Sequence, residues 1–242
     1  MPGGSGEVVS RRARPAKAPL SRDGIVATGL DLLGEQGLPG LSLRKIAAAL
    51  DTGPASLYAY VANLEELRAL VLDKALGDVA HGVGQGREWR PRLKAILTSY
   101  VEVLLAKPGL APLATTTIAS GPNAMRLTES LLEALIGGGV DPAAAAWGVD
   151  LLLLQVTGIA AEQSARRSQG DVMGRVAKAY AEAPAHELPL VHALHKELFS
   201  GPGSSRFGWA LDVLITGITQ APRPPTGSEP GHDRPGHDKD PA

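Results

Sequence analysis

The sequence lacks several features that would mark other classes of protein. It has no cysteine among its 242 residues, which excludes disulfides, thiolate metal sites and thiol nucleophiles and favours a cytoplasmic location. Its net charge of −1 at pH 7 argues against a uniformly basic nucleic-acid coat protein. It also has no phosphate-binding glycine loop, no nucleophile elbow and no paired-histidine helix motif. We therefore predict that the chain is not an enzyme and uses no cofactor.

Signals for β-structure are missing as well, since the chain shows no convincing apolar–polar alternation and no hairpin turn. We therefore predict an all-α fold. Composition divides the chain into four parts: a flexible basic arm at 1–20, a three-helix domain at 21–76, a larger helical domain at 77–220 and a tail at 221–242. Proline, glycine and charged residues alternate in the tail, which predicts disorder there.

The N-terminal arm has a clear charge bias. Against the single acid Glu7 stand the basic residues Arg11, Arg12, Arg14, Lys17 and Arg22. A flexible basic arm could track DNA phosphates or enter the minor groove. An ordinary disordered leader is an equally good interpretation. The arm does not resemble a signal peptide, because no apolar segment follows the charges.

Residues 41–67, LSLRKIAAALDTGPASLYAYVANLEEL, are the most informative segment. Apolar residues at i, i+3, i+4 and i+7 give its first helix one buried face: Leu43, Ile46, Ala47 and Leu50. Ser42 stands just before this run, where its hydroxyl can accept a free backbone N–H. Residues 51–53 then break the pattern. The segment thus predicts a short helix followed by a tight turn.

A second short helix is expected to begin at Pro54, because its fixed φ and missing N–H suit the first helical position. Leu57 and Val61 are one turn apart and should point inward. Small residues such as Ala55 and Ser56 then face outward, where they allow close approach to DNA. This arrangement is typical of a helix-turn-helix, whose second helix enters the major groove.

Flanking signals complete a three-helix unit. A helix at about 22–36 precedes the motif, and Gly37 suits the position just after its end. Asn63, followed three residues later by Glu66, predicts the start of a further helix that runs to about Leu76.

The stretches GLSLRKIAAAL and SLYAYVANLEEL resemble the DNA-binding domain of the TetR family of transcriptional repressors, over about residues 21–76. The resemblance implies that Arg44 contacts a guanine, because a guanidinium can bond both O6 and N7. It implies that Ser56 bonds a base or a phosphate, and that Tyr58 and Tyr60 hold phosphates. The predicted DNA-binding residues are Ser42, Arg44, Lys45, Pro54, Ala55, Ser56, Tyr58 and Tyr60.

Simpler interpretations stay open for these residues. Arg44 and Lys45 could form a solvated helix face, and the two tyrosines could be half-buried core aromatics. The chain also departs from the family at Leu64, where lysine or arginine is common. Phosphate binding at that helix N-terminus would then depend on backbone N–H groups and the helix dipole.

The larger domain should contain one long helix, capped at residues 141–142 and continuing to about Arg167. It is apolar on almost all sides, so a transmembrane span of ~20 residues is an alternative. Asp150 and Gln155 in its middle and the absence of basic flanks argue against that alternative. Burial against its own domain and a partner subunit explains the pattern better. Further helices are expected at 90–106, 110–119, 124–136 and 205–218.

The resemblance implies that the C-terminal helices pair across a two-fold axis to form a homodimer. Recognition helices one DNA turn apart, roughly 34–36 Å, would then match a palindromic operator. The predicted interface residues are Leu153, Val156, Phe207, Leu211, Leu214 and Ile218. No membrane partner is expected.

The resemblance also implies that the larger domain receives a small-molecule effector. The predicted pocket residues, each of which could also be plain core, are Tyr100, Leu104, Met125, Trp147, Gln155 and Met173. His192 and His195 share a helix face and could hold a metal. Without a clear third ligand, surface or capping histidines are the better interpretation, and we predict no metal site.

The sequence therefore predicts a ligand-responsive, sequence-specific transcriptional repressor. The alternatives are an architectural DNA-binding protein without an effector and, less favoured, an all-helical enzyme. A buried, partly polar cavity in the larger domain would favour a regulator over an architectural protein.

Overall fold

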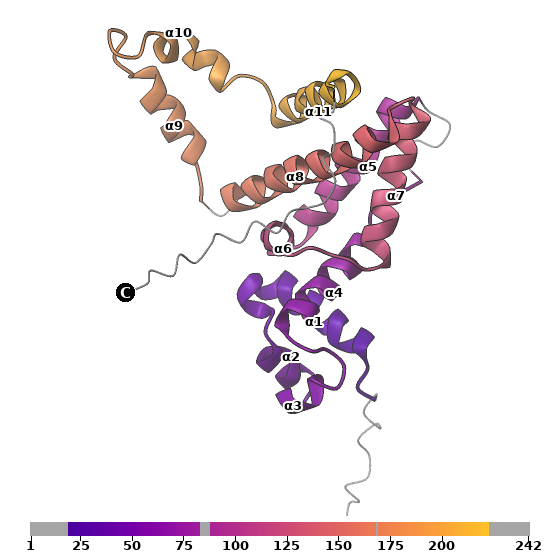
Figure 1. Ribbon diagram of the computed structural model, residues 1–242. Helices are drawn as coiled ribbons and strands as arrows, with labels where there is room; N and C mark the ends of the chain where they lie inside the picture. Colours follow the sequence, from indigo (N-terminus) through magenta and orange to yellow (C-terminus); the bar gives the residue numbers. More distant parts are fainter. Residues whose placement is uncertain (1–18, 83–87, 168, 223–242) are drawn as a thin grey trace, which may run out of the picture.

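The computed structural model describes residues 19–82, 88–167 and 169–222. Every regular element in these ranges is helical (Figure 1), which confirms the predicted all-α fold. The arm and the tail predicted at 1–20 and 221–242 lie almost wholly outside the described residues. In chain order the elements are α1 (Arg22–Gln36), the 3-10 helix η1 (Leu38–Gly40), α2 (Leu43–Ala49), α3 (Pro54–Leu57), α4 (Leu64–Leu76), α5 (Trp89–Ala106), α6 (Leu110–Thr116), α7 (Pro122–Gly137), α8 (Pro142–Arg167), α9 (Val172–Ala181), α10 (Pro189–Leu198) and α11 (Gly203–Gln220).

Local capping sets where the helices of the DNA-binding unit begin and end. The side chain of Ser42 accepts the N–H of Lys45 at 3.3 Å, and α3 begins at Pro54, as predicted. Gly37 ends α1 with a φ of 66°, a left-handed conformation that glycine adopts without strain. Its N–H donates to the carbonyl of Leu33. Helix α2, which these signals delimit, packs against both α1 and α3.

Helix α4 belongs to both halves of the molecule. Its apolar face packs with α1, α2 and the residues that follow α3, around a fully buried set formed by Ile25, Leu33, Ile46, Leu57, Leu67 and Val71. The same helix continues upward to the larger domain, where its C-terminal end meets α6 and α7 (Figure 1). One rigid element therefore joins the helix-turn-helix to the rest of the chain.

Helix α8 is the central helix of the larger domain, in contact with α5, α6, α7 and α11. By length and composition alone it could cross a membrane. A core helix passes the same test, and the side chains of Leu152 and Val156 are fully buried inside this domain. At Gly148 the helix comes so close to α11 that an added Cβ would lie 2.8 Å from Ile218. Part of its apolar character thus serves packing within the chain, while Trp147, Leu151 and Leu154 remain exposed.

Helices α9 and α10 are the elements that the sequence analysis did not delimit. They extend from the end of α8 and return the chain to α11 (Figure 1). The two helices contact each other, and the rings of Tyr180 and Phe199 meet edge to face at 5.2 Å. Neither helix contains a buried residue. The pair formed by α9 and α10 is therefore held by far fewer apolar contacts than the domain from which it projects.

Candidate DNA interface and effector pocket

The outer surface of α2 and α3 presents the residues predicted to contact DNA. Leu57 and Val61 are buried, as their spacing predicted. This orientation leaves the opposite side of the motif in solvent. Ser42 is partly exposed, and the remaining candidates are exposed: Arg44, Lys45, Pro54, Ala55, Ser56, Tyr58 and Tyr60. The structure therefore brings all the predicted DNA-binding residues to one exposed motif.

The two basic residues of α2 differ in how they are held. The ammonium of Lys45 donates to the side-chain oxygen of Gln36 at 2.7 Å, which ties α2 to the end of α1. Arg44 makes no hydrogen bond or ion pair with any other residue that the structure describes. Its guanidinium therefore keeps all its donors for an external acceptor.

The tyrosines after the recognition helix are exposed side chains. Tyr58 has 57% of its surface exposed and Tyr60 has 37%. Tyr58 is more exposed than a half-buried core aromatic, whereas the exposure of Tyr60 fits both interpretations, so the phosphate contacts stay a prediction. Leu57 lies between Ser56 and Tyr58 and is fully buried, so its packing holds the backbone of both exposed neighbours in place.

The N-terminus of α4 fixes the far side of the motif. Asn63 accepts the N–H of Glu66 at 2.8 Å, and the carboxylate of Glu66 accepts the N–H of Ala62 at 2.6 Å. This is a capping box shifted by one residue on the return bond. Arg22 of α1 also pairs with Glu66. The segment after the recognition helix is thus tied to both α1 and α4.

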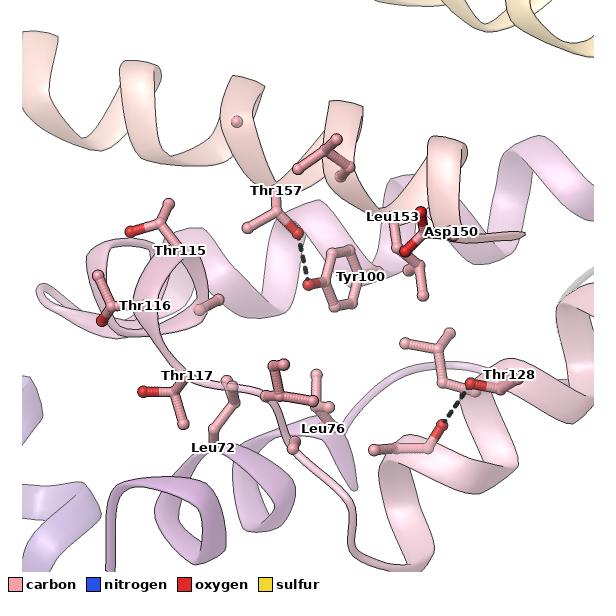
Figure 2. Close-up of a pocket in the computed structure, with 17 residues that line it drawn as sticks. Leu72, Leu76, Tyr100, Thr115, Thr116, Thr117, Thr128, Asp150, Leu153 and Thr157 are labelled. Carbon is pink, nitrogen blue, oxygen red and sulfur yellow. Dashed lines mark hydrogen bonds between the residues drawn. The ribbon is translucent and has the colours of Figure 1, made fainter. Parts of the chain in front are cut away.

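A cavity of about 550 Å³ lies between α4, α5, α6, α7 and α8 (Figure 2). This volume is in the range of small-molecule sites. Its lining combines leucine and alanine side chains with hydroxyl groups and one carboxylate: Leu72, Leu76, Tyr100, Ala114, Thr115, Thr116, Thr117, Ile118, Ala119, Ala124, Leu127, Thr128, Asp150, Leu153, Leu154, Thr157 and Gly158. The larger domain therefore contains a partly polar cavity, which favours a regulator, although Ile118 and Leu154 of its lining are exposed to solvent.

A single polar contact crosses the pocket floor. The hydroxyls of Tyr100 on α5 and Thr157 on α8 are 2.7 Å apart and buried (Figure 2). Burial raises the pKa of Tyr100, and the hydrogen bond to Thr157 opposes part of that rise. Because the ordinary tyrosine pKa is already near 10, the phenol stays protonated at neutral pH.

Of the six predicted pocket residues, one lines the cavity and five do not. Tyr100 lines the cavity, whereas Leu104 is fully buried in the core and does not reach it. The other four candidates are exposed and lie outside the cavity lining: Met125, Trp147, Gln155 and Met173. The sequence analysis missed Asp150 as a pocket residue and the threonine run 115–117. That run of polar residues at the end of an apolar helix was a visible signal for a polar cavity wall.

Comparison with known proteins identifies the family. Residues 84–221 match the family described as "Tetracyclin repressor-like, C-terminal domain", and residues 25–70 match "Bacterial regulatory proteins, tetR family". The chain belongs to the TetR family. It is therefore a transcriptional regulator with an N-terminal helix-turn-helix and a C-terminal domain of the ligand-binding kind, as the sequence predicted.

Individual TetR relatives agree with this assignment. Apo ActR from Streptomyces coelicolor is 36% identical and has a TM-score of 0.77, with 84% of this chain and 97% of that chain covered. The repressor DrrR1 of Streptomyces coeruleorubidus is 28% identical over 86% of this chain and 80% of its own length. A helix-turn-helix regulator of Saccharopolyspora erythraea is 36% identical over 120 residues, half of this chain and 51% of that protein.

In this TetR chain a buried carboxylate joins α4 to the larger domain. Asp73 of α4 accepts the N–H of Ala124, in the first turn of α7, at 2.9 Å. The side-chain amide of Asn123 donates to the carbonyl of Asp73 at 3.0 Å. Residue 121 is glycine because an added Cβ would lie 2.3 Å from the Asp73 carboxyl carbon. Asp73 thus caps α7 from the helix that carries the DNA-binding unit.

Two of the six predicted interface residues lie in the core of their own protomer, so their assignment was wrong, and the other four stay a prediction. Val156 and Leu211 retain at most 1% of their surface and have nothing left for a partner to contact. The others are partly buried against the same core: Leu153, Phe207, Leu214 and Ile218. Leu211 therefore serves packing within the protomer, whereas Phe207, Leu214 and Ile218 on the same helix keep some exposed surface.

The histidines weighed as metal ligands make backbone contacts. The Nδ1 atom of His195 lies 2.6 Å from the carbonyl oxygen of His192, and Nδ1 of His192 lies 3.1 Å from that of Ala183. Within the ranges that the structure describes, no group of three or more histidine, cysteine or acidic side chains is placed to hold a metal ion.

Proposed function

We propose that the protein is a cytoplasmic repressor that binds a palindromic operator as a homodimer and leaves it when a small molecule occupies the pocket. The observation that carries the proposal is α4. Its N-terminal end supports the exposed helix-turn-helix, and Leu72 and Leu76 near its C-terminal end line the cavity. A change in the pocket therefore acts directly on the element that positions the recognition helix.

The DNA contacts proposed here follow from exposure and hydrogen-bonding capacity. Arg44 has a free guanidinium and is assigned to a guanine, where two parallel hydrogen bonds discriminate by about 1–3 kcal/mol. Ser56 is assigned to a base edge or phosphate, and Tyr58 and Tyr60 to phosphates, which fix register without reading sequence. Lys45 serves mainly to tie α2 to Gln36 of α1.

The dimer interface is assigned to the apolar side chains that the protomer leaves exposed on α8 and α11. These include Trp147 and Leu151 on α8 and Trp209 and Val213 on α11, while the exposed Leu154 of α8 borders the pocket. Each would be covered by the same helices of a second copy, as a two-fold interface requires. The two helix-turn-helix motifs would then face successive major grooves.

Release needs only a modest preference of the effector for the state that does not fit DNA. A coupling of about 1–3 kcal/mol changes operator affinity by roughly 5–150-fold. ActR, the relative described above, has been crystallised in complex with actinorhodin and with (S)-DNPA. That relative supports a small-molecule effector for this chain, and the cavity of about 550 Å³ supplies the space.

The proposal is tested by selecting bound sequences from random duplex DNA with the purified full-length protein. We expect a palindrome whose half-sites are one helical turn apart. Recovery of no consensus, or of an isolated half-site, would contradict the dimeric, sequence-specific function.

The selected duplex then tests Arg44 directly. Arg44→Ala should lower affinity for the operator by about 1–3 kcal/mol and leave weak, salt-sensitive binding to unrelated DNA. Arg175→Ala removes the same charge from the exposed surface of α9 and should leave both affinities unchanged. Fluorescence anisotropy measures the affinity of each variant for the operator duplex and for an unrelated duplex. Equal discrimination by wild type and Arg44→Ala would remove Arg44 from base recognition.

A further inference from the structure

The effector pocket has an unusual charge balance. Among the seventeen residues that line it, Asp150 is the only one with a charged side chain, and none is lysine, arginine or histidine. Within the part of the chain that the structure describes, no cation lies within ion-pair distance of the Asp150 carboxylate. The pocket therefore presents one negative charge, on an exposed side chain, with no ion-pair partner among the described residues.

Three threonine hydroxyls of the lining are already committed as donors, whereas Thr117 makes no side-chain hydrogen bond among the described residues. Thr115 donates to the carbonyl of Pro112 at 2.7 Å. Thr128 donates to that of Ala124 at 3.1 Å (Figure 2). Thr116 makes a longer contact of the same kind, 3.4 Å to Leu113. A hydroxyl has one hydrogen and two lone pairs, so each of these oxygens can offer a ligand only an acceptor.

The contact between Tyr100 and Thr157 has the same effect at the pocket floor. One of the two hydroxyl hydrogens is used between them, so only one donor remains from the pair. The polar capacity of the lining thus consists mainly of acceptors, with Asp150 as the strongest of them.

Asp150 is positioned to meet a bound molecule. Residues 150, 153, 154, 157 and 158 follow one another at i, i+3, i+4, i+7 and i+8 on α8, so they share the face that forms one pocket wall. Figure 2 shows Asp150 on this wall with Leu153 and Thr157. On the opposite side, Leu72 and Leu76 of α4 and Leu127 of α7 give the cavity an apolar wall.

From this lining we infer that the effector is an amphipathic cation: an apolar body that fills the leucine-lined part of the pocket, with an ammonium or similar positively charged donor that reaches Asp150. Threonine oxygens accept from its remaining donors. An anionic molecule of the same size would place its charge beside Asp150 with no cation to offset it, so the pocket selects against it. This inference rests on the proposed function, because it takes the cavity to be the effector site.

Three matched fluorescent probes test the inference on the full-length protein. Dansylcadaverine carries a terminal ammonium, dansyl-pentylamide has no charge in that position, and dansyl-aminohexanoate ends in a carboxylate. We expect dansylcadaverine to bind about fivefold more tightly than the neutral probe, because Asp150 is exposed and an exposed charge pair contributes at most about 1 kcal/mol, and the carboxylate probe to bind more weakly than both. Equal affinities, or preference for the carboxylate probe, would overturn the inference.

Substitution of Asp150 assigns the selectivity to this residue. Asp150→Asn keeps the size of the side chain and removes its charge, so it should reduce the preference for dansylcadaverine to less than about twofold and leave binding of the neutral probe unchanged. Glu162→Gln is the matched control, because it removes a carboxylate from the same helix outside the cavity. Cation preference retained by Asp150→Asn would also overturn the inference.

Operator release separates this inference from the proposed function. Each probe is titrated into the protein bound to its selected duplex, with anisotropy as the readout. If neutral and cationic probes release DNA equally, the cavity is the effector site but its charge selectivity is refuted. If no duplex is selected at all, the proposed function fails whatever the probes bind.

Discussion

The two ends of α4 are held by different kinds of contact. At the N-terminal end, Asn63 and Glu66 make hydrogen bonds at the surface, and Arg22 adds an exposed ion pair. At the C-terminal end, Asp73 is buried and bonds the first turn of α7, beside leucine side chains that line the pocket. Exposed polar contacts are exchanged with water at little net cost, whereas buried ones leave an unsatisfied group when broken. The polar contacts of the helix are therefore firmer at the pocket end than at the DNA-binding end, where apolar packing by Leu67 and Val71 holds it.

The largest loss of stability is expected from a substitution at the buried C-terminal end of α4. Asp73→Ala removes the cap of α7 and leaves the N–H of Ala124 without its acceptor, so the free energy of unfolding should fall by about 2 kcal/mol. Asp78→Ala, an exposed acid just beyond the same helix, is the control. Urea unfolding measures both. If Asp73→Ala and Asp78→Ala lower the free energy of unfolding equally, the buried cap of α7 does not hold this end of α4 more firmly than exposed contacts do.

An intermediate effect is expected at the cap of α4. Asn63→Ala removes the acceptor for the N–H of Glu66 and should lower the free energy of unfolding by about 1 kcal/mol. Asn63→Asp keeps an acceptor at the same position and should stay close to wild type. A loss as large in Asn63→Asp as in Asn63→Ala, by urea unfolding, would show that the cap is not the cause.

The smallest effect is expected from the exposed ion pair. Arg22→Ala should change stability by less than about 1 kcal/mol, because about half of the arginine side chain is exposed and water competes for Glu66. The difference should shrink further at high salt, which screens exposed charges. Thermal unfolding at low and high salt measures it. A loss that exceeds that of Asn63→Ala and persists in high salt would reverse the order proposed here.

Signals between residues close in the sequence were reliable. Ser42, Pro54, Asn63 and the pair 141–142 each marked a helix start that the structure has. A cap depends on a side chain and a backbone N–H two or three residues away, so the sequence contains both partners. The exposed surface of the helix-turn-helix follows from the same short-range information, since Leu57 and Val61 set its inward side.

The residues that line the pocket could not be predicted from local sequence, because contacts between distant segments determine them. Its wall on α8 is one face of a helix that is apolar on nearly all sides, so periodicity did not show which face borders a cavity. Trp147 and Gln155 were expected there, but they lie outside the lining, while Asp150 and Thr157 belong to it. The rotation of α8 is set by α5, α6, α7 and α11 together, residues far apart in the chain.

The exposed pair of helices α9 and α10 affects how quickly the regulator is degraded in the cell. Because neither helix buries a side chain, this segment should open without unfolding of the core and exchange its amide hydrogens early. Transiently open, exposed segments are where proteases cut first. A cut between these two helices would sever α11 from the polypeptide that carries the DNA-binding unit. This pair of helices would then set the turnover of the regulator independently of its effector.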